Sequence, residues 1–261
     1  MDPLLVFDRA AVRRHRDRAA HTVDQVADVL RDAAERLLDR LDDTTRRFSD
    51  ALDVGGRGIV APLLRQRGMR VVSSDLSTAM AARNGGLCVA ADEEFLPFAP
   101  HSFDLIVASL SLHWVNDLPG ALLQFRQALR PGGLLLASLP ALGTLGELRS
   151  ALTEAEDAVM GRVSPRVSPF PELRDCAHLL QRAGFTLPVA DMEEIRMLYA
   201  NPFALLTELR AAGEGNATRE RSRTVPDRTL FPAALARLPT QDGRVAVTLR
   251  MAVMTGWAPD A

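Results

Sequence analysis

The middle of the chain alternates short apolar strands with helical segments, and this alternation limits the fold more than any other feature of the sequence. Strands are predicted at 51–54, 70–75, 87–92 and 134–139, and a longer apolar stretch runs from Phe103 to Val115. Segments of helical composition lie between them. A strand that is followed by a helix and then by another strand requires a parallel crossover connection. We therefore predict an α/β fold built on a doubly wound, mostly parallel sheet.

Amphipathic helices are predicted on both sides of this alternation. Before the first strand, apolar residues recur at helical spacing over 23–41, and charged residues fill the opposite face. After the last parallel strand, helices are predicted at 145–159 and 172–184, separated by a connector that is rich in proline.

The C-terminal part of the chain contains two more predicted strands, around 194–199 and 245–253, with a mixed segment at 201–238 between them. An insertion between late strands lies over the carboxyl edge of the sheet or beside it. We therefore expect 201–238 to form a lid or a platform for the substrate. The chain divides into an N-terminal helical segment, a core and a C-terminal part that completes the sheet: 1–47, 48–139 and 140–261.

The basic residues of the chain are all arginine. The sequence contains 31 arginines and no lysine, against 33 acidic residues, so the net charge is -2. Without lysine there is no Schiff-base nucleophile, no pyridoxal-phosphate anchor and no phosphate-binding lysine of a nucleotide loop. The near-neutral total argues against a nucleic-acid partner. Any basic docking surface must consist of arginine, and we expect it within 9–18 and 219–228.

Apolar runs are short and cysteines are few. No stretch approaches the roughly 18 apolar residues of a membrane-spanning helix, so no transmembrane segment is predicted. Cys88 and Cys176 give neither a disulfide framework nor a paired metal-ligand spacing. The five histidines are not spaced as a facial triad, so no metal site is predicted. These features favour a cytoplasmic protein.

Carboxylates and glycines follow successive predicted strands, at the edge where an open parallel sheet binds its ligand. Asp53 ends the first strand, and three glycines after it let the backbone approach a ligand closely: Gly55, Gly56 and Gly58. Asp75 lies 22 residues after Asp53, where a carboxylate can accept both hydroxyls of a ribose. Asp92, after the third strand, can accept from the exocyclic amine of adenine. The pattern predicts a nucleoside cofactor at this edge.

Two classes of cofactor bind to glycine loops of this kind. Gly56-x-Gly58-x-x-Ala61 formally matches the dinucleotide fingerprint. However, Asp53 stands just before the glycines, where its negative charge would repel a pyrophosphate and attract the amino-acid portion or the sulfonium of S-adenosylmethionine. We therefore predict S-adenosyl-L-methionine as the cofactor, with a dinucleotide as the alternative.

Successive motifs resemble those of class I S-adenosylmethionine-dependent methyltransferases over about residues 50–139. The motifs are Asp53-Val54-Gly55-Gly56-Arg57-Gly58, Asp75, Ala91 to Phe98, Ser102-Phe103-Asp104 and Leu129-Arg130-Pro131-Gly132-Gly133. The resemblance implies a Rossmann-like fold with a seven-stranded sheet, N-terminal helices and a helical lid. It also implies that further residues bind the cofactor beside the aspartates and glycines already named: Leu76, Glu93 and Ser109.

A narrower resemblance spans nearly the whole chain. The element from Ser109 to Pro119, together with 91–98 and 144–149, is similar to the respiratory complex I assembly factors that hydroxylate an arginine of an NADH dehydrogenase subunit. Malonyl-acyl-carrier-protein O-methyltransferases of biotin synthesis share part of it. His113 and Trp114 lie in this element after the fourth strand. We name both as candidate catalytic residues, because an imidazole can act as a base and an indole can wall the pocket.

The chain departs from these family patterns at two places. The glycine motif is one residue shorter than the usual Asp-x-Gly-x-Gly-x-Gly, which changes the amide that points at the cofactor. The residues before Thr144 are Ala141-Leu142-Gly143, where the assembly factors tend to carry Gly-Gly-Asp.

Three hypotheses for the function follow from these patterns. The first is an enzyme that acts on a protein substrate, an NADH dehydrogenase subunit, by methyl transfer or arginine hydroxylation during complex I assembly. Such an enzyme is expected in the cytoplasm or, through its partner, at the inner face of a respiratory membrane. The second is a carboxyl O-methyltransferase for an acyl-carrier substrate. The third is an assembly factor that binds S-adenosylmethionine without catalysis.

Overall fold

The computed structural model describes residues 5–260, and its centre is an eight-stranded sheet. The strands are β1 (Asp50–Val54), β2 (Arg70–Asp75), β3 (Leu87–Ala90), β4 (Phe103–Ser109), β5 (Leu129–Pro140), β6 (Thr186–Tyr199), β7 (Thr240–Gln241) and β8 (Arg244–Trp257). They follow the order β3-β2-β1-β4-β5-β8-β6, and the two-residue β7 pairs with β8 alone. β1 to β5 run parallel, whereas β8 runs antiparallel to β5 and β6. The predicted mostly parallel α/β sheet is confirmed, with β7 added to the seven strands of the main path.

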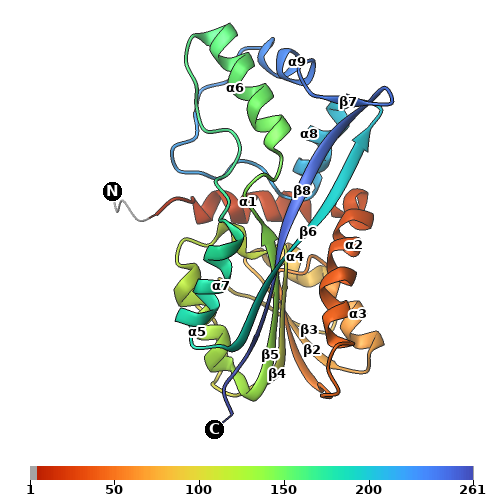
Figure 1. Ribbon diagram of the computed structural model, residues 1–261, viewed down its shortest axis with the longest axis vertical. Helices are drawn as coiled ribbons and strands as arrows, with labels where there is room; N and C mark the ends of the chain where they lie inside the picture. Colours follow the sequence, from red (N-terminus) through yellow and green to blue (C-terminus); the bar gives the residue numbers. More distant parts are fainter. Residues whose placement is uncertain (1–4, 261) are drawn as a thin grey trace.

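Helices cover both faces of this sheet (Figure 1). They are α1 (Arg9–Ala19), α2 (Ala27–Leu38), α3 (Val60–Gln66), α4 (Thr78–Arg83), α5 (Leu118–Ala128), α6 (Gly146–Met160), α7 (Leu173–Arg182), α8 (Pro202–Ala211) and α9 (Leu230–Leu235). The described residues also contain three short 3-10 helices: η1 (Val23–Val26), η2 (Asp39–Leu41) and η3 (Leu112–Trp114). Side chains of successive residues in β4 point to opposite faces of the sheet, because side chains alternate along a strand. Leu105 packs with the residues of α2 and α3, and Ile106 packs with those of α5 and α7.

A third apolar core lies beyond the end of the parallel strands. β6 and β8 have 14 residues each and extend past their neighbours (Figure 1). Their outer ends contribute Tyr199 and Val247, which pack with Leu148 of α6, Leu205 of α8 and Leu230 of α9. We keep the name lid for these three helices, and their role over a substrate stays a prediction. The predicted insertion 201–238 therefore supplies α8 and α9, and α6 comes from an earlier part of the chain.

α1 crosses the carboxyl edge of the parallel strands (Figure 1). The side chain of Asp8 caps it, because Oδ1 accepts a hydrogen bond from the Ala11 amide at 3.0 Å. Val12 and Ala19 on this helix are buried, and so is Arg16, which is only 2% exposed. The expectation of a solvated arginine surface at 9–18 is therefore wrong for Arg16, although Arg13 and its neighbour Arg14 are exposed.

Some predicted boundaries are wrong for local reasons. The strand predicted at 87–92 ends at Ala90, because Asp92 turns the chain by accepting a hydrogen bond from the amide of Glu94 at 3.0 Å. β6 begins at Thr186 instead of near Glu194. It is an edge strand with one half-exposed face, so its apolar signal is weak. The predicted helix 23–41 is divided into η1, α2 and η2. Within residues 5–260, every helix is too short or too polar to cross a membrane.

Candidate cofactor and substrate site

The loop after β1 brings the backbone into close contact with the side chains around it. Gly55 has a left-handed φ of +68° and donates its amide hydrogen to the carbonyl oxygen of Ser74 at 2.7 Å. A Cβ at Gly55 would lie 2.7 Å from Cβ of Ser111, and one at Gly56 would lie 2.2 Å from Oδ1 of Asp53. The loop therefore requires glycine at both positions. Gly58 does not contact Asp53 or Ser111. Its amide donates to Oδ1 of Asn84, the residue at the end of α4.

Asp53 is the most deeply buried carboxyl group at this edge. It is 0% exposed, and neither of its carboxylate oxygens accepts a hydrogen bond of good geometry among the described residues, although the nearby amides of Ala61 and Gly56 lower its pKa somewhat. Burial, together with the nearby Asp75, raises the pKa of Asp53 to about 7. The side chain is thus poised between its neutral and ionised forms near neutral pH. A cationic group on a ligand would favour the ionised form.

Asp75 at the end of β2 pairs with an arginine from α1. Arg16 Nη1 lies 3.1 Å from Oδ2 of Asp75, and the two side chains are 2% and 1% exposed. The same Nη1 is 3.4 Å from the carbonyl oxygen of Gly55, and the amide of Ser77 donates to Oδ1 of Asp75 at 2.8 Å. Asp75 is therefore a buried carboxylate that is paired with α1 through Arg16, and the same arginine also contacts the glycine loop.

Arg9, seven residues earlier on α1, forms a second group of ion pairs. It pairs with Asp92 through Nε at 3.3 Å and also with the buried Glu93. Its Nη1 donates to the carbonyl oxygen of Trp114 at 3.1 Å. Burial raises the pKa of Glu93, and the charge of Arg9 opposes that rise. Arg9 and Arg16 thus connect α1 to the two carboxylates that were predicted to contact a nucleoside.

A third group of polar contacts centres on Glu214 of the lid. His113 Nε2 is 2.7 Å from its Oε2, and Nε1 of Trp114 donates to the same oxygen at 2.9 Å. Arg57 of the glycine loop pairs with Oε1 and donates from Nη2 to the carbonyl oxygen of Leu110 at 2.9 Å. Burial alone would raise the pKa of Glu214, but His113 and Arg57 outweigh it and hold that pKa far below its ordinary value. The carboxylate is therefore ionised, and it joins the lid to the core.

The local sequence after α8 places this glutamate. Gly213 has a left-handed φ of +80° and donates to the carbonyl oxygen of Arg210 at 3.0 Å, and the amide of Glu214 donates to that of Leu209 at 2.8 Å. These two bonds are those of a Schellman motif, in which glycine reverses the chain at the end of a helix. The side chain of Glu214 consequently points from the end of α8 toward η3.

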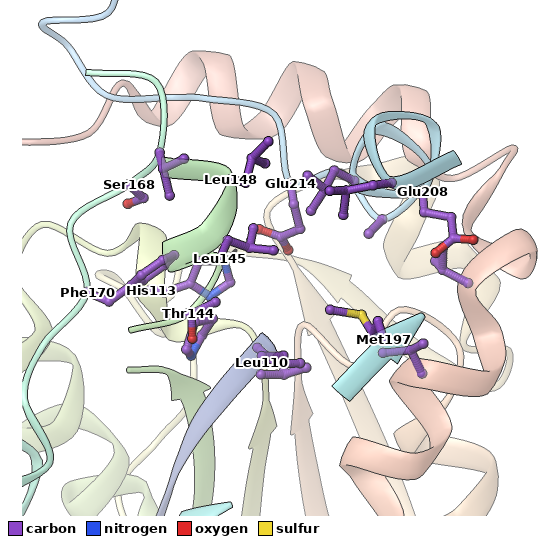
Figure 2. A pocket seen from close by; sticks show the side chains of 18 of the residues that line it. Leu110, His113, Thr144, Leu145, Leu148, Ser168, Phe170, Met197, Glu208 and Glu214 are labelled. Atoms are coloured by element: carbon purple, nitrogen blue, oxygen red, sulfur yellow. Dashed lines mark hydrogen bonds and ion pairs between the residues drawn. The ribbon is translucent and has the colours of Figure 1, made fainter. Parts of the chain in front are cut away.

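A largely apolar cavity of about 160 Å³ lies between the lid and the carboxyl edge of the sheet. Figure 2 shows His113 and Phe170 on one side of it, Met197 and Glu208 on the other, and Glu214 between Leu148 and Leu145. Arg57 and Trp114 also line the cavity, so it adjoins the glycine loop. The arrangement suits an apolar substrate chain that ends at the polar group around Glu214.

The structure gathers most of the predicted site residues into this region. Gly55, Asp75, Asp92 and Glu93 contact the arginines of α1, and Asp53 lies against Gly56 of the same loop. His113 and Trp114 contact Glu214. Leu76 packs beside Trp114 and α1. Ser109 is buried at the end of β4 and faces Ser138 across the sheet, next to Leu110 of the cavity. Their roles in binding and catalysis stay predictions.

Four residues of the site were missed from the sequence: Arg9, Arg16, Arg57 and Glu214. A helical reading of 9–19 would have placed Arg9, Val12, Arg16 and Ala19 on one stripe, at spacings of three, four and three residues. Such a stripe indicates arginines that face the core. Glu214 has no comparable local signal, because its contacts lie about 100 residues away in the chain.

Comparisons with known proteins agree with this geometry. A family model described as a methyltransferase domain matches residues 22–188. The mitochondrial arginine-hydroxylase NDUFAF5 of Homo sapiens is 37% identical over 266 residues, which cover 97% of this chain and 77% of the relative. The malonyl-[acyl-carrier protein] O-methyltransferase of Xylella fastidiosa is 36% identical over 269 residues, which cover 97% of this chain and 89% of the relative.

Solved structures support the fold. The YcgJ protein of Bacillus subtilis superposes with a TM-score of 0.58 at 12% identity, over 86% of this chain and 98% of its own. A SAM-dependent methyltransferase of Archaeoglobus fulgidus superposes with a TM-score of 0.52 at 14% identity, over 87% and 94%.

Proposed function

Because the chain belongs to the methyltransferase-domain family, we propose that it is an S-adenosyl-L-methionine-dependent enzyme that modifies a protein substrate during respiratory complex I assembly. The observation that carries the proposal is the extent of the match to relatives named as arginine hydroxylases. They are 36–37% identical over 97% of the chain, so the match includes α1 and the lid as well as the core. Arginine hydroxylation of an NADH dehydrogenase subunit is the specific reaction that we propose.

The residues at the carboxyl edge fit S-adenosyl-L-methionine. Asp75 would accept the ribose hydroxyls and Asp92 the adenine amine, and the glycine loop with Asp53 would face the amino-acid portion. The unpartnered oxygens of the buried Asp53 support this assignment, because a buried carboxylate needs a cationic or hydrogen-bonding partner. The pairs formed by Arg9 and Arg16 must open or be shared when the cofactor binds. When bound, this cofactor supplies an electrophilic methyl group for methyl transfer, whereas hydroxylation of an arginine also needs an oxygen-donating oxidant from solution.

The remaining residues would bind and orient the substrate. His113 and Trp114 lie where the cavity meets the glycine loop, and we assign them to the wall and the acid-base chemistry of the reaction. The apolar lining of the cavity would exclude water from that point. Ser109 and Leu76 would support the cofactor from beside Leu110 and Trp114.

A carboxyl O-methyltransferase that acts on an acyl carrier is the second candidate. Relatives with that name match 97% of the chain at 36% identity, a value close to that of the hydroxylases. Two arginines line the cavity, Arg57 and Arg166, and either could meet a substrate carboxylate. Arg57 is already paired with Glu214, and Arg166 is 2.6 Å from Glu156.

A deletion strain separates these candidates. The proposal predicts that deletion removes a modification from an arginine of an NADH dehydrogenase subunit, as measured by mass spectrometry of that subunit. An unchanged arginine mass would refute hydroxylation. Biotin auxotrophy of the same strain would instead support the acyl-carrier reaction.

The cofactor can be tested on the purified chain. Isothermal titration calorimetry is expected to detect binding of S-adenosylmethionine and none of NAD, and Asp75→Ala is expected to abolish the binding. Preferential binding of NAD would refute the cofactor assignment. If Asp75→Ala and Asp92→Ala both lose the cofactor but preserve complex I assembly, the protein acts as an assembly factor without catalysis. The location in the cytoplasm or at the inner face of a respiratory membrane stays a prediction.

A further inference from the structure

The cavity is lined by a second carboxylate, Glu208 of α8, on the side opposite His113 (Figure 2). The two carboxylates of the cavity differ in what they bind. Both oxygens of Glu214 are engaged, because Oε1 pairs with Arg57 and Oε2 accepts from an imidazole and an indole. Oε2 of Glu208 accepts from the hydroxyl of Tyr199 at 2.7 Å, whereas its Oε1 accepts no hydrogen bond among the described residues and is not fully buried. Glu208 therefore has one oxygen available to a ligand.

Tyr199 of β6 holds the Glu208 carboxylate at the wall of the cavity. The tyrosine is 8% exposed, and burial together with the hydrogen bond to Glu208 raises the pKa of its phenol. The phenol therefore stays protonated and donates. A neutral hydroxyl fixes the orientation of the carboxylate but supplies no positive charge. A half-buried carboxylate in these surroundings favours a cationic partner.

Apolar side chains surround Glu208 in the cavity. Leu205 and Leu209 lie within one turn of it on α8, and Met197 of β6 has its sulfur 3.7 Å from the hydroxyl of Tyr199. Such walls suit the methylene stem of a long side chain, while its charged end seeks a polar partner. Arginine has such a stem and ends in a planar cation with five N–H donors, which can meet a carboxylate through two hydrogen bonds. Its two parts match the two parts of this wall.

We propose that Glu208 binds the guanidinium group of the substrate arginine and thereby determines which side chain the cavity accepts. The arginine stem then extends from Glu208 along the apolar wall toward Arg57 and His113, where the cavity adjoins the glycine loop. In this orientation the carbons of the stem, and not the guanidinium nitrogens, face the predicted cofactor. The inference rests on the proposed function in taking arginine as the modified residue, but recognition of the charge involves no chemical step.

The charges of the cavity discriminate against a substrate that ends in a carboxylate. Arg57 pairs with Glu214, and Arg166 pairs with Glu156, whereas no basic side chain of residues 5–260 forms an ion pair with Glu208. A carboxylate substrate would have to displace a glutamate from one of these arginines and would be repelled by Glu208. A guanidinium meets an available acceptor without breaking an existing pair. The cavity therefore favours an arginine over the acyl chain of the second candidate function.

Two probes of nearly equal shape test this recognition in the full-length protein: N-acetyl-arginine amide and N-acetyl-citrulline amide, in which a neutral urea replaces the guanidinium. By isothermal titration calorimetry, the wild type is expected to bind the arginine probe at least about tenfold more tightly, since a hydrogen bond to a charged group contributes about that factor. Glu208→Gln should lose this preference, and Glu208→Ala should lose it as well. Glu154→Gln, which changes an exposed glutamate of α6, should preserve it. Thermal melting confirms that each variant is folded.

A wild type that binds the two probes equally, or that does not bind the arginine probe, would overturn the proposal. A folded Glu208→Gln that keeps the wild-type preference would overturn it too. The deletion strain tests the proposed function separately. If the arginine mass is unchanged by deletion while the preference depends on Glu208, hydroxylation is refuted and the guanidinium site stands. If deletion removes the modification but the probes bind equally, the proposed function stands and the role of Glu208 is refuted.

Discussion

Asp53→Asn is expected to make the protein more stable at neutral pH and to weaken its cofactor site. Burial raises the pKa of Asp53 to about 7, against 3.8 for the exposed group. Between these two values the unfolded chain carries an ionised Asp53, while the folded protein keeps the side chain protonated. The folded state binds more protons there, so stability is present in full below about pH 4 and is lost as the pH rises to about 7.

The magnitude follows from the same two pKa values. One pKa unit corresponds to about 1.4 kcal/mol, so ionisation of Asp53 costs the folded protein about 4 kcal/mol once the pH exceeds 7. Asparagine has nearly the same shape and stays neutral. The free energy of unfolding of Asp53→Asn should therefore rise relative to that of the wild type by about 1.4 kcal/mol per pH unit between pH 5 and 7, and the difference should level off above about pH 7.

Equilibrium unfolding in urea at pH 5, 6, 7 and 8 measures this difference. Asp50→Asn is the matched control, because Asp50 lies on the same strand but its pKa is lowered by its hydrogen bond to Arg130. Its contribution is present above about pH 4 and is lost only in stronger acid, so the difference between Asp50→Asn and the wild type should be constant over this range. Parallel curves for the wild type and Asp53→Asn would refute the buried titration.

The same titration should appear in cofactor binding. A cationic ligand favours the ionised form of Asp53, so the affinity for S-adenosylmethionine should rise with pH and reach its plateau above about pH 7. Isothermal titration calorimetry of Asp53→Asn should give a weaker affinity without this rise. A stabilised variant with wild-type affinity would show that Asp53 serves neither the fold nor the cofactor.

Three further substitutions test the packing and the ion pairs, each by urea unfolding. Phe125→Ala should cost about 3–5 kcal/mol, because the ring is 0% exposed in the core between the sheet, α5 and α7. A loss below about 1 kcal/mol would contradict that packing. Asp117→Ala should cost about 1 kcal/mol, since Oδ1 caps α5 by accepting from the Gly120 amide at 2.9 Å, and no loss would mean that the cap is dispensable. Arg16→Met should cost about 3–5 kcal/mol, because it leaves Asp75 buried without its partner. Arg13→Met, on the exposed side of α1, should change the stability by less than about 0.5 kcal/mol. Equal effects of the two substitutions would argue against the buried pair.

The core of the fold was predictable because its signals are local. Fully buried parallel strands give continuous apolar runs, as in 105–108, and the glycine loop and the caps that border them use residues with narrow conformational roles. The cap that Asp117 forms at the start of α5 is a signal of the same local kind. β6 was predicted too short, because an edge strand with a half-exposed face has no comparable apolar run.

The site was predictable only in part. The carboxylates and glycines follow consecutive strands, so the rule for parallel sheets indicates that they share one edge. That rule does not identify the cationic side chains that pair with these carboxylates. The arginines of α1 were expected at the surface, yet Arg16 is buried against Asp75, because a helix that crosses the carboxyl edge turns one face toward the strand ends.

The sequence by itself determined the α/β architecture, the class of the protein and the residues at the carboxyl edge of the sheet. Periodicity, glycine conformation and the succession of strands and helices along the chain can be read from short segments, and a resemblance along the chain preserves them. The tertiary structure alone decided which charges meet. The pairing of Arg16 with Asp75 and of His113 with Glu214 joins residues 59 and 101 positions apart. The packing of α1 and of the lid onto the sheet creates those contacts, and it brings scattered polar residues together as buried pairs.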